Sequence, residues 1–166
     1  MESRAKLLGH PIHPMLIVLP LGLFVTAVVF DAVAVWTDSA SFSVAAYWNV
    51  AAGILGGLLA AVFGLIDWLA IPSGTRAKRI GLLHGGANVV VVLLFGLVWL
   101  MRGETPSHAA TTLAMGMEVA ALALGAVAGW LGGELVDRLG VGVDDGAHLD
   151  APSSLSGPAR SSRSRA

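Results

Sequence analysis

Long segments without a charged side chain are the feature that most constrains this chain. Asp, Glu, Lys and Arg are absent from residues 7–30, 39–66 and 80–101. A fourth apolar stretch, from about Thr111 to Val136, is interrupted by Glu118 and Glu134. A helix that crosses a membrane needs about 20 consecutive, mostly apolar residues. The sequence therefore predicts four membrane-spanning helices.

Composition supports an all-α, polytopic membrane protein. The 166 residues are 55% hydrophobic and 13% charged, whereas a soluble domain carries about 25% charged residues. We expect helices over residues 15–36, 44–71, 80–101 and 111–136. Their short connections predict an antiparallel up-down four-helix bundle, because a short loop makes consecutive helices antiparallel.

Three regions follow from this reading. Residues 1–14 form a cytoplasmic N-terminal segment that leads into the membrane, and residues 15–139 form the transmembrane domain. Residues 140–166 are rich in Asp, Gly, Ser, Pro and Arg, a composition that cannot bury a core. We expect them to be a disordered cytoplasmic tail.

Basic residues predict the orientation, because Lys and Arg are retained on the cytoplasmic side. Four crossings leave Arg102 as the sole basic residue on one side and place all the others opposite. This predicts a bacterial-type inner membrane protein with both termini in the cytoplasm. The alternative for the first segment is a signal peptide cleaved after Ala34. The absence of cysteine excludes disulfides, thiolate ligands and covalently attached haem.

A weak internal repeat is also present. His13 opens the first helix and Asp67 closes the second, 54 positions later, while His84 opens the third and Asp137 closes the fourth, 53 positions later. This indicates a duplicated helical hairpin, related by an axis along the membrane normal.

Polar residues gather at the cytoplasmic leaflet of the predicted bundle. They are His10, His13, Asp67, His84, Asn88, Glu134 and Asp137. Histidines at helix N-termini and carboxylates at helix C-termini are disfavoured when charged. Mutual hydrogen bonds, a bound cation or a haem iron would each compensate for this placement.

Three readings of this cluster stay open. Haem b would take His13 and His84 as axial ligands, with His10 in reserve, and Asp67, Asn88, Asp137 and Glu134 as outer partners that orient the imidazoles. A transition metal ion would instead be bound by His10, His13, His84 and Asp67. In the third reading the cluster only locks the helices together.

The opposite leaflet has its own polar residues, Asp31, Asn49, Glu118 and the cation Arg102. Charged groups inside a membrane pair with one another, so we expect an Arg–carboxylate anchor. The residues between Glu118 and His84 are apolar, which argues against a continuous proton path.

Two end motifs carry a family resemblance. The opening Gly9-His10-Pro11-Ile12-His13-Pro14-Met15-Leu16 and the closing Trp130-Leu131-Gly132-Gly133-Glu134-Leu135-Val136 with Gly140-Val141-Gly142-Val143 resemble those of a bacterial membrane family, domain of unknown function 2231. The resemblance covers residues 7 to about 145 and includes Asp67, His84 and Asn88. It implies four spans and, by association with relatives fused to iron–sulfur or cytochrome modules, a redox setting. This chain lacks a further histidine that the family often has near Val18 or Leu19.

The sequence thus favours a non-catalytic or electron-carrying membrane module over an enzyme, because no nucleophile–base pair, phosphate-binding loop or zinc motif is present. The expected partners are the lipid bilayer, a redox protein and a second copy of the chain, with no nucleic acid. A structural anchor or scaffold is the main alternative, and a transporter or proton pathway is the third.

Overall fold

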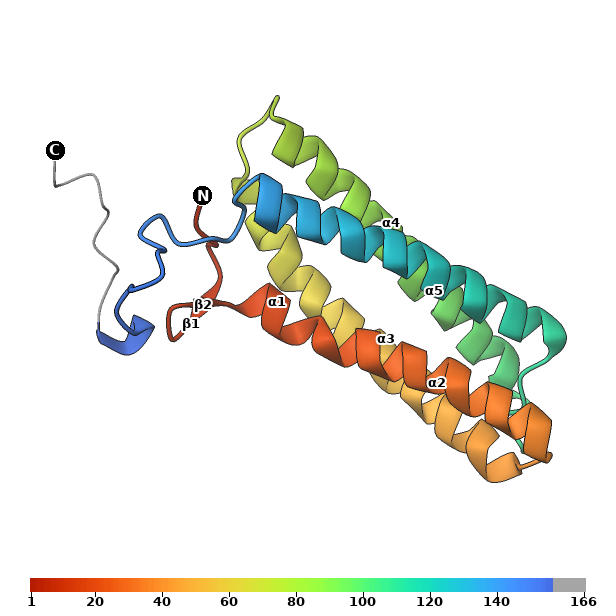
Figure 1. Ribbon diagram of the computed structural model, residues 1–166. Helices are drawn as coiled ribbons and strands as arrows, with labels where there is room; N and C mark the ends of the chain where they lie inside the picture. The colour runs from red at the N-terminus through yellow and green to blue at the C-terminus, as the bar shows by residue number, and fades with distance from the viewer. Residues whose placement is uncertain (157–166) are drawn as a thin grey trace, which may run out of the picture.

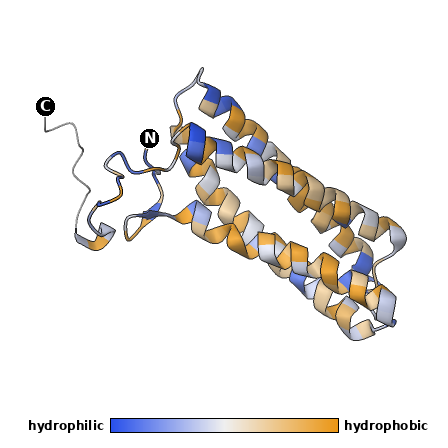
Figure 2. Cartoon of the chain, in the orientation of Figure 1, coloured by the Kyte–Doolittle hydropathy of each residue, from blue (hydrophilic) through white to orange (hydrophobic). Residues whose placement is uncertain are grey.

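The computed structural model describes residues 1–156 and confirms the predicted four-helix architecture. Four helical segments are long and apolar enough to cross a membrane: Ile12–Thr37, Ala40–Ala70, Arg76–Gly103 and Thr112–Arg138. They run up and down in one elongated bundle (Figure 1). Hydrophobic residues cover the middle of every helix and hydrophilic residues collect at the ends of the bundle (Figure 2).

The first span consists of two helices, α1 (Ile12–Leu16) and α2 (Val18–Thr37). The regular helix is interrupted at Ile17 because Pro20 has no N–H to donate to the carbonyl four residues earlier. Hydrogen bonding resumes at once, since Leu21 N–H donates to the Ile17 carbonyl at 3.2 Å.

The remaining spans are α3 (Ala40–Ala70), α4 (Arg76–Gly103) and α5 (Thr112–Gly133). A threonine begins each of the last two: the hydroxyl oxygens of Thr75 and Thr111 accept a backbone N–H from three residues later, as N-caps do. Helix α5 continues into one turn of π-helix, η1 (Glu134–Arg138).

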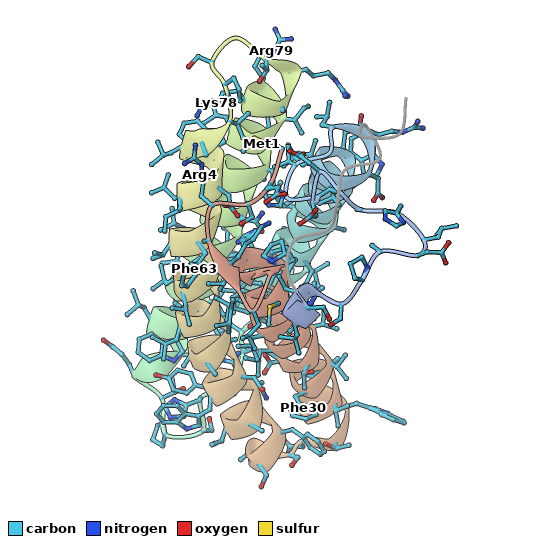
Figure 3. The ribbon with its side chains drawn as sticks, turned by 90° about the vertical axis from the view of Figure 1, so that its left-hand side faces the viewer. Met1, Arg4, Phe30, Phe63, Lys78 and Arg79 are labelled. Carbon is cyan, nitrogen blue, oxygen red and sulfur yellow. The ribbon has the colours of Figure 1, made fainter. Side chains whose placement is uncertain are left out.

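Two helical hairpins make up the bundle. Helix α2 packs mainly on α3, and α4 packs mainly on α5, with smaller contacts between the hairpins. The short loops at residues 38–39 and 104–111 lie at one end, which we call the distal end (Figure 1). The N-terminal segment and the 71–75 turn lie at the other, the terminal end. Figure 3 shows Arg4, Lys78 and Arg79 at the terminal end and Phe30 toward the distal end.

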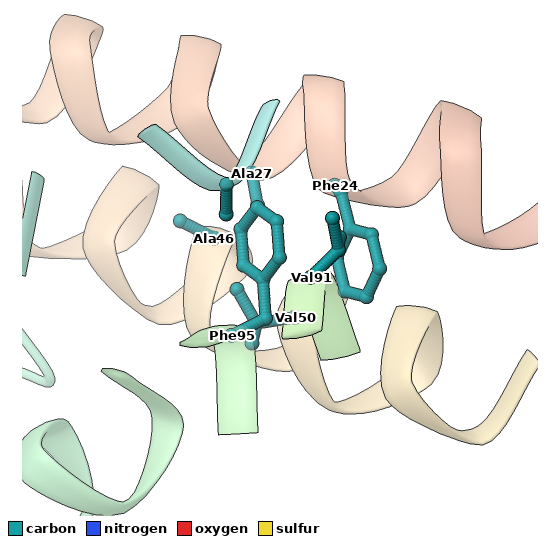
Figure 4. Packing of buried hydrophobic residues seen from close by; sticks show 7 residues of the cluster. Phe24, Ala27, Ala46, Val50, Val91 and Phe95 are labelled. Carbon is teal, nitrogen blue, oxygen red and sulfur yellow. The ribbon is translucent and has the colours of Figure 1, made fainter. Parts of the chain in front are cut away.

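The hairpins meet at a small apolar core halfway along the bundle (Figure 4). The rings of Phe24 and Phe95 stack with centroids 4.0 Å apart and planes inclined by 2°. Buried around them are Ala27, Ala46, Val50, Val91 and Ala121. The outer surface of the bundle is apolar too, and Trp36 and Trp130 are largely exposed, as side chains facing lipid would be.

The N-terminal segment and residues 140–156 cover the terminal end. A short antiparallel hairpin, β1 (Lys6–Leu7) and β2 (His10–Pro11), precedes α1, and a 3₁₀ turn, η2 (Ser154–Ser156), ends the described chain. The Met1 ammonium donates to the Gly140 carbonyl at 2.9 Å, and Gly142 N–H donates to the Met1 carbonyl at 2.9 Å.

The beginning of the predicted tail thus contacts the N-terminus through two hydrogen bonds, one donated by Met1 and one accepted by it. The disorder and the cytoplasmic side of residues 140–166 stay predictions. Of this tail, residues 157–166 lie outside the described residues.

Candidate functional site

Two histidines face each other between the hairpins on the terminal side of the core. The rings of His13 and His84 have centroids 6.3 Å apart and planes inclined by 85°. His13 Nδ1 lies 2.8 Å from the Ala60 carbonyl oxygen, and His84 Nδ1 lies 2.8 Å from that of Ala128. A carbonyl can only accept, so each Nδ1 carries a proton. In the neutral form of each ring, the lone pair is then on Nε2.

Glycines provide the space for both rings. A Cβ at Gly64, one turn beyond Ala60, would lie 2.9 Å from His13 Cε1 and Nδ1. A Cβ at Gly132, one turn beyond Ala128, would lie 3.1 Å from His84 Cε1. The two histidines thus have equivalent surroundings, each formed by a helix carbonyl and a glycine of the partner helix in the same hairpin. We call these two sites, Ala60 with Gly64 and Ala128 with Gly132, the histidine seats.

Side chains next to the histidines are less buried than those of the core. On the face of α4 that carries His84, Val91 and Phe95 are buried, whereas Asn88 is exposed and His84 is half-buried. The corresponding face of the first span shows the same change, since Phe24 is buried and Ile17 is 39% exposed. Burial therefore decreases from the phenylalanine pair toward the terminal end.

Asn88 is the polar neighbour of His84. Its amide nitrogen donates to the His84 carbonyl at 2.9 Å and lies 3.4 Å from His84 Nε2. The Asn88 amide is a donor that faces Nε2. This agrees with a His84 tautomer whose proton is on Nδ1, which the Ala128 carbonyl requires.

The structure places the other predicted site residues elsewhere. Asp67 accepts hydrogen bonds from the Ser3 hydroxyl at 2.8 Å and from Arg4 N–H at 2.7 Å, so it holds the N-terminal segment and not a histidine. His10 Nε2 lies 3.3 Å from the Ser154 hydroxyl.

Glu134 and Asp137 also stay apart from the histidine pair. Glu134 pairs with Arg76 at 2.5 Å, and Asp137 is exposed on η1. Within residues 1–156, no three His, Cys, Asp or Glu side chains come together as a metal-binding group.

Pairs of residues separated by 71 positions support the duplication. His13 faces His84, Phe24 stacks on Phe95, and Asp31 pairs with Arg102. A residue that contacts its own counterpart lies on a two-fold axis, so an approximate axis runs along the bundle through these three contacts. The seats repeat as well, since Ala60 and Gly64 recur 68 positions later as Ala128 and Gly132. At that spacing Leu135 is the counterpart of Asp67, so the equivalence predicted for Asp67 and Asp137 is not the one the structure contains.

The third contact on this axis is a buried ionic cluster at the distal end, which confirms the predicted Arg–carboxylate anchor. Arg102 is 2% exposed, Asp31 1% and Glu118 0%. The guanidinium donates twice to Asp31 at 2.7 Å, once to Glu118 at 3.1 Å, and once each to the carbonyls of Ser43 and His108. All five N–H groups of the guanidinium are therefore used.

The loop before α5 closes this cluster, which sequence reasoning missed. His108 adopts a left-handed backbone conformation, with φ 50°, and its Nδ1 lies 2.9 Å from the Arg102 carbonyl. Its ring stacks on Tyr47 with centroids 4.0 Å apart. The hydrogen bonds between His108 and Arg102 use backbone carbonyl groups, so no side-chain pattern in the sequence predicts them.

A cavity of about 230 Å³ lies beside the cluster at the distal end. Its lining includes the acidic residues Asp31 and Asp38 and the hydroxyls of Ser39, Ser43 and Ser107. We call it the distal cavity.

Residues 9–145 match a protein family that is described as predicted membrane protein (DUF2231). The chain belongs to this family. The DUF2231 match covers all four spans, the histidine pair and the distal cluster. No curated protein and no solved structure matches the chain.

Proposed function

We propose that this DUF2231 protein is a membrane module that binds haem b between its two hairpins, with Nε2 of His13 and Nε2 of His84 as the axial ligands. The observation that carries this proposal is the pair of equivalent imidazoles whose Nδ1 atoms are both engaged by backbone carbonyls. Histidines that bind metals are held in this way, because the second nitrogen donates to a carbonyl and fixes the tautomer and the ring orientation.

The spacing of the two rings fits a shared metal centre. One metal that was bound by both rings would need them to lie close together, since a metal–nitrogen bond is about 2 Å long. The rings of His13 and His84 are separated by 6.3 Å. Ile17 and Asn88, on the same helix faces as His13 and His84, are exposed and would contact a group held by both histidines.

The number of protein ligands favours haem over a bare transition metal ion. A haem needs only two axial ligands from the protein, whereas a bare ion in a protein site takes three or four. In the part of the chain that the structure describes, His10 and Asp67 are engaged with Ser154 and Ser3 and do not complete such a set. Asn88 then acts as a positioning residue for His84.

The bound haem would supply one-electron transfer, which is the chemistry of an electron carrier. Arg4, Lys78 and Arg79 at the terminal end support a cytoplasmic location for that end in a bacterial inner membrane, by the positive-inside rule. The histidine pair then lies on the cytoplasmic side of the phenylalanine core, where a redox partner protein would exchange electrons.

The test is the visible absorption spectrum of the detergent-purified protein, expressed with ample haem and recorded oxidised and reduced. We expect a sharp Soret band and narrow reduced α and β bands, typical of six-coordinate haem. His84→Ala and His13→Ala should each abolish these bands, and His148→Ala, an exposed residue outside the bundle, should leave them unchanged.

The rival function is a structural anchor, in which the two histidines only tie helices within each hairpin. Size-exclusion profiles and helical circular dichroism of the same variants separate the two. Colourless wild-type protein together with loss of the folded bundle in His84→Ala would support the anchor and reject the haem site.

A further inference from the structure

The distal cluster holds more negative than positive charge. Asp31 and Glu118 supply two carboxylates, Arg102 supplies one guanidinium, and all three side chains are at most 2% exposed. No other Lys or Arg among residues 1–156 forms an ion pair with either carboxylate. An uncompensated charge buried in a membrane protein is energetically costly, and such a group takes up a proton instead.

Hydrogen bonding distinguishes the two carboxyl groups. Both oxygens of Asp31 accept from Arg102 at 2.7 Å, the bidentate arrangement that stabilises an ionised carboxylate. Glu118 accepts only one bond, at 3.1 Å through Oε1, and its buried Oε2 has no hydrogen-bond partner. The extra proton therefore belongs on Glu118.

The surroundings contain no other group that would neutralise Glu118. Asp31 faces the cluster from α2, Tyr47 and the Ser43 carbonyl from α3, Arg102 from α4 and His108 from the following loop. The guanidinium is saturated by its five acceptors, and the His108 ring is stacked on Tyr47 with Nδ1 directed to the Arg102 carbonyl. Three residues after Glu118 on α5, Ala121 is fully buried in the apolar core.

The distal cavity provides a route to water. Asp31 and Ser43 belong both to the cluster and to the lining of the cavity, and Asp38 and Ser39 lie at the chain turn beside it. Arg102 Nη1 donates to both Asp31 and Glu118, so the carboxyl groups of these residues are close neighbours. Glu118 itself does not line the cavity, but its carboxyl group neighbours that of Asp31, which does.

We propose that the Asp31–Arg102–Glu118 cluster is a proton-binding site, in which Glu118 is a neutral acid at neutral pH and exchanges its proton with the aqueous phase at the distal end. Binding forms an O–H bond on Glu118 Oε2 with a proton taken from cavity water, and release returns it there. With the proton bound, the cluster has one positive and one negative charge and is electrically neutral.

The primary test is ¹³C NMR of wild-type protein labelled at the glutamate side-chain carboxyl, in detergent or lipid, between pH 5 and pH 8. We expect one glutamate signal to keep the chemical shift of a protonated acid at pH 7. Glu118→Gln should remove that signal, and Glu104→Gln, which changes an exposed residue at the end of α4, should retain it.

The assignment also works if Glu118→Gln does not fold. A protonated signal that survives Glu2→Gln, Glu104→Gln and Glu134→Gln in turn belongs to Glu118, because these are the other glutamates of the chain. Ionised signals from every glutamate at pH 7 would overturn the proposal. An unfolding temperature that rises specifically with Na⁺ or K⁺ would then show that a metal cation balances the charge.

Exchange with the distal phase has its own readout. The infrared band of the protonated carboxyl should shift after transfer of the folded wild-type protein into D₂O. Ala109→Trp, which fills the distal cavity from its lining, should slow that shift several-fold. A band that never shifts while the protein stays folded would reject the exchange route and leave a permanently trapped proton.

Discussion

The two polar centres of this bundle lie on the same approximate axis and differ in how completely their polar atoms are satisfied. At the distal end, each N–H of Arg102 has an acceptor and the three charged side chains are buried. On the terminal side, His13 and His84 are half-buried, and each is held through Nδ1 by one backbone carbonyl. A guanidinium with five acceptors ties several helices together, whereas each imidazole is tied to one helix of its own hairpin.

Duplication explains why the two centres share one architecture. At the two-fold axis, equivalent residues of the two hairpins contact each other. Two copies of the same residue must therefore pack favourably, or the two positions must change into a complementary pair. The histidine and phenylalanine positions kept the same residue in both hairpins. The third position diverged, with an acid at Asp31 and a base at Arg102, because two like charges at 2.7 Å would repel each other strongly.

The largest difference between the two centres should appear on removing the cation. In Arg102→Gln two buried carboxyl groups lose their partner, and breaking a buried ion pair in this way costs about 3–5 kcal/mol. We expect a large drop in unfolding temperature in detergent, or no folded protein. Arg79→Gln, an exposed change at the terminal end, should unfold like wild type. An Arg102→Gln variant as stable as wild type would mean that the cluster does not hold the bundle together.

The histidine seats should show an intermediate effect. Gly64→Ala places a methyl group 2.9 Å from the His13 ring, and Gly132→Ala places one 3.1 Å from the His84 ring. Overpacking of this kind costs about 1–3 kcal/mol, and it should displace the imidazole and weaken the haem bands proposed above. The effect should be larger at Gly64.

Gly129→Ala is the matched control for the seats. It lies on the same helix as Gly132, but a Cβ there meets nothing within 4 Å. Because alanine favours a helix over glycine by about 1 kcal/mol, this variant should be slightly more stable than wild type. Equal losses at Gly129 and Gly132 would indicate a general intolerance of α5 and not a histidine seat.

The parts of this protein that the sequence predicted are those set by hydrophobicity and charge. Three charge-free segments and a fourth apolar stretch that contains Glu118 and Glu134 are sufficient to predict four spans, and a lone Arg102 among carboxylates is sufficient to predict their pairing. The contacts that the sequence does not predict involve backbone groups. Asp67, predicted as an outer partner of the histidines, accepts hydrogen bonds from the backbone N–H groups of Arg4 and Ala5. The carbonyls of Ala60, Ala128 and His108 that orient the site residues have no signature in any side-chain pattern.

The smallest effect should come from Asp67, which ties the N-terminal segment to the end of α3 and belongs to neither centre. Asp67→Ala removes the acceptor for the Ser3 hydroxyl and for Arg4 N–H. Hydrogen bonds to a charged group are worth about 1.5–3 kcal/mol each when buried, and less here because the contact is partly exposed. The loss should release the segment without unfolding the bundle, so trypsin should cleave after Arg4 and Lys6 several-fold faster while the unfolding temperature stays the same. Asp137→Ala, at an exposed carboxylate of η1, should leave the cleavage rate unchanged. A fall in haem absorbance in Asp67→Ala with unaltered cleavage would instead show that Asp67 supports the histidine pair. Asp67 would then belong to the binding centre on the axis and would not only hold the N-terminal segment.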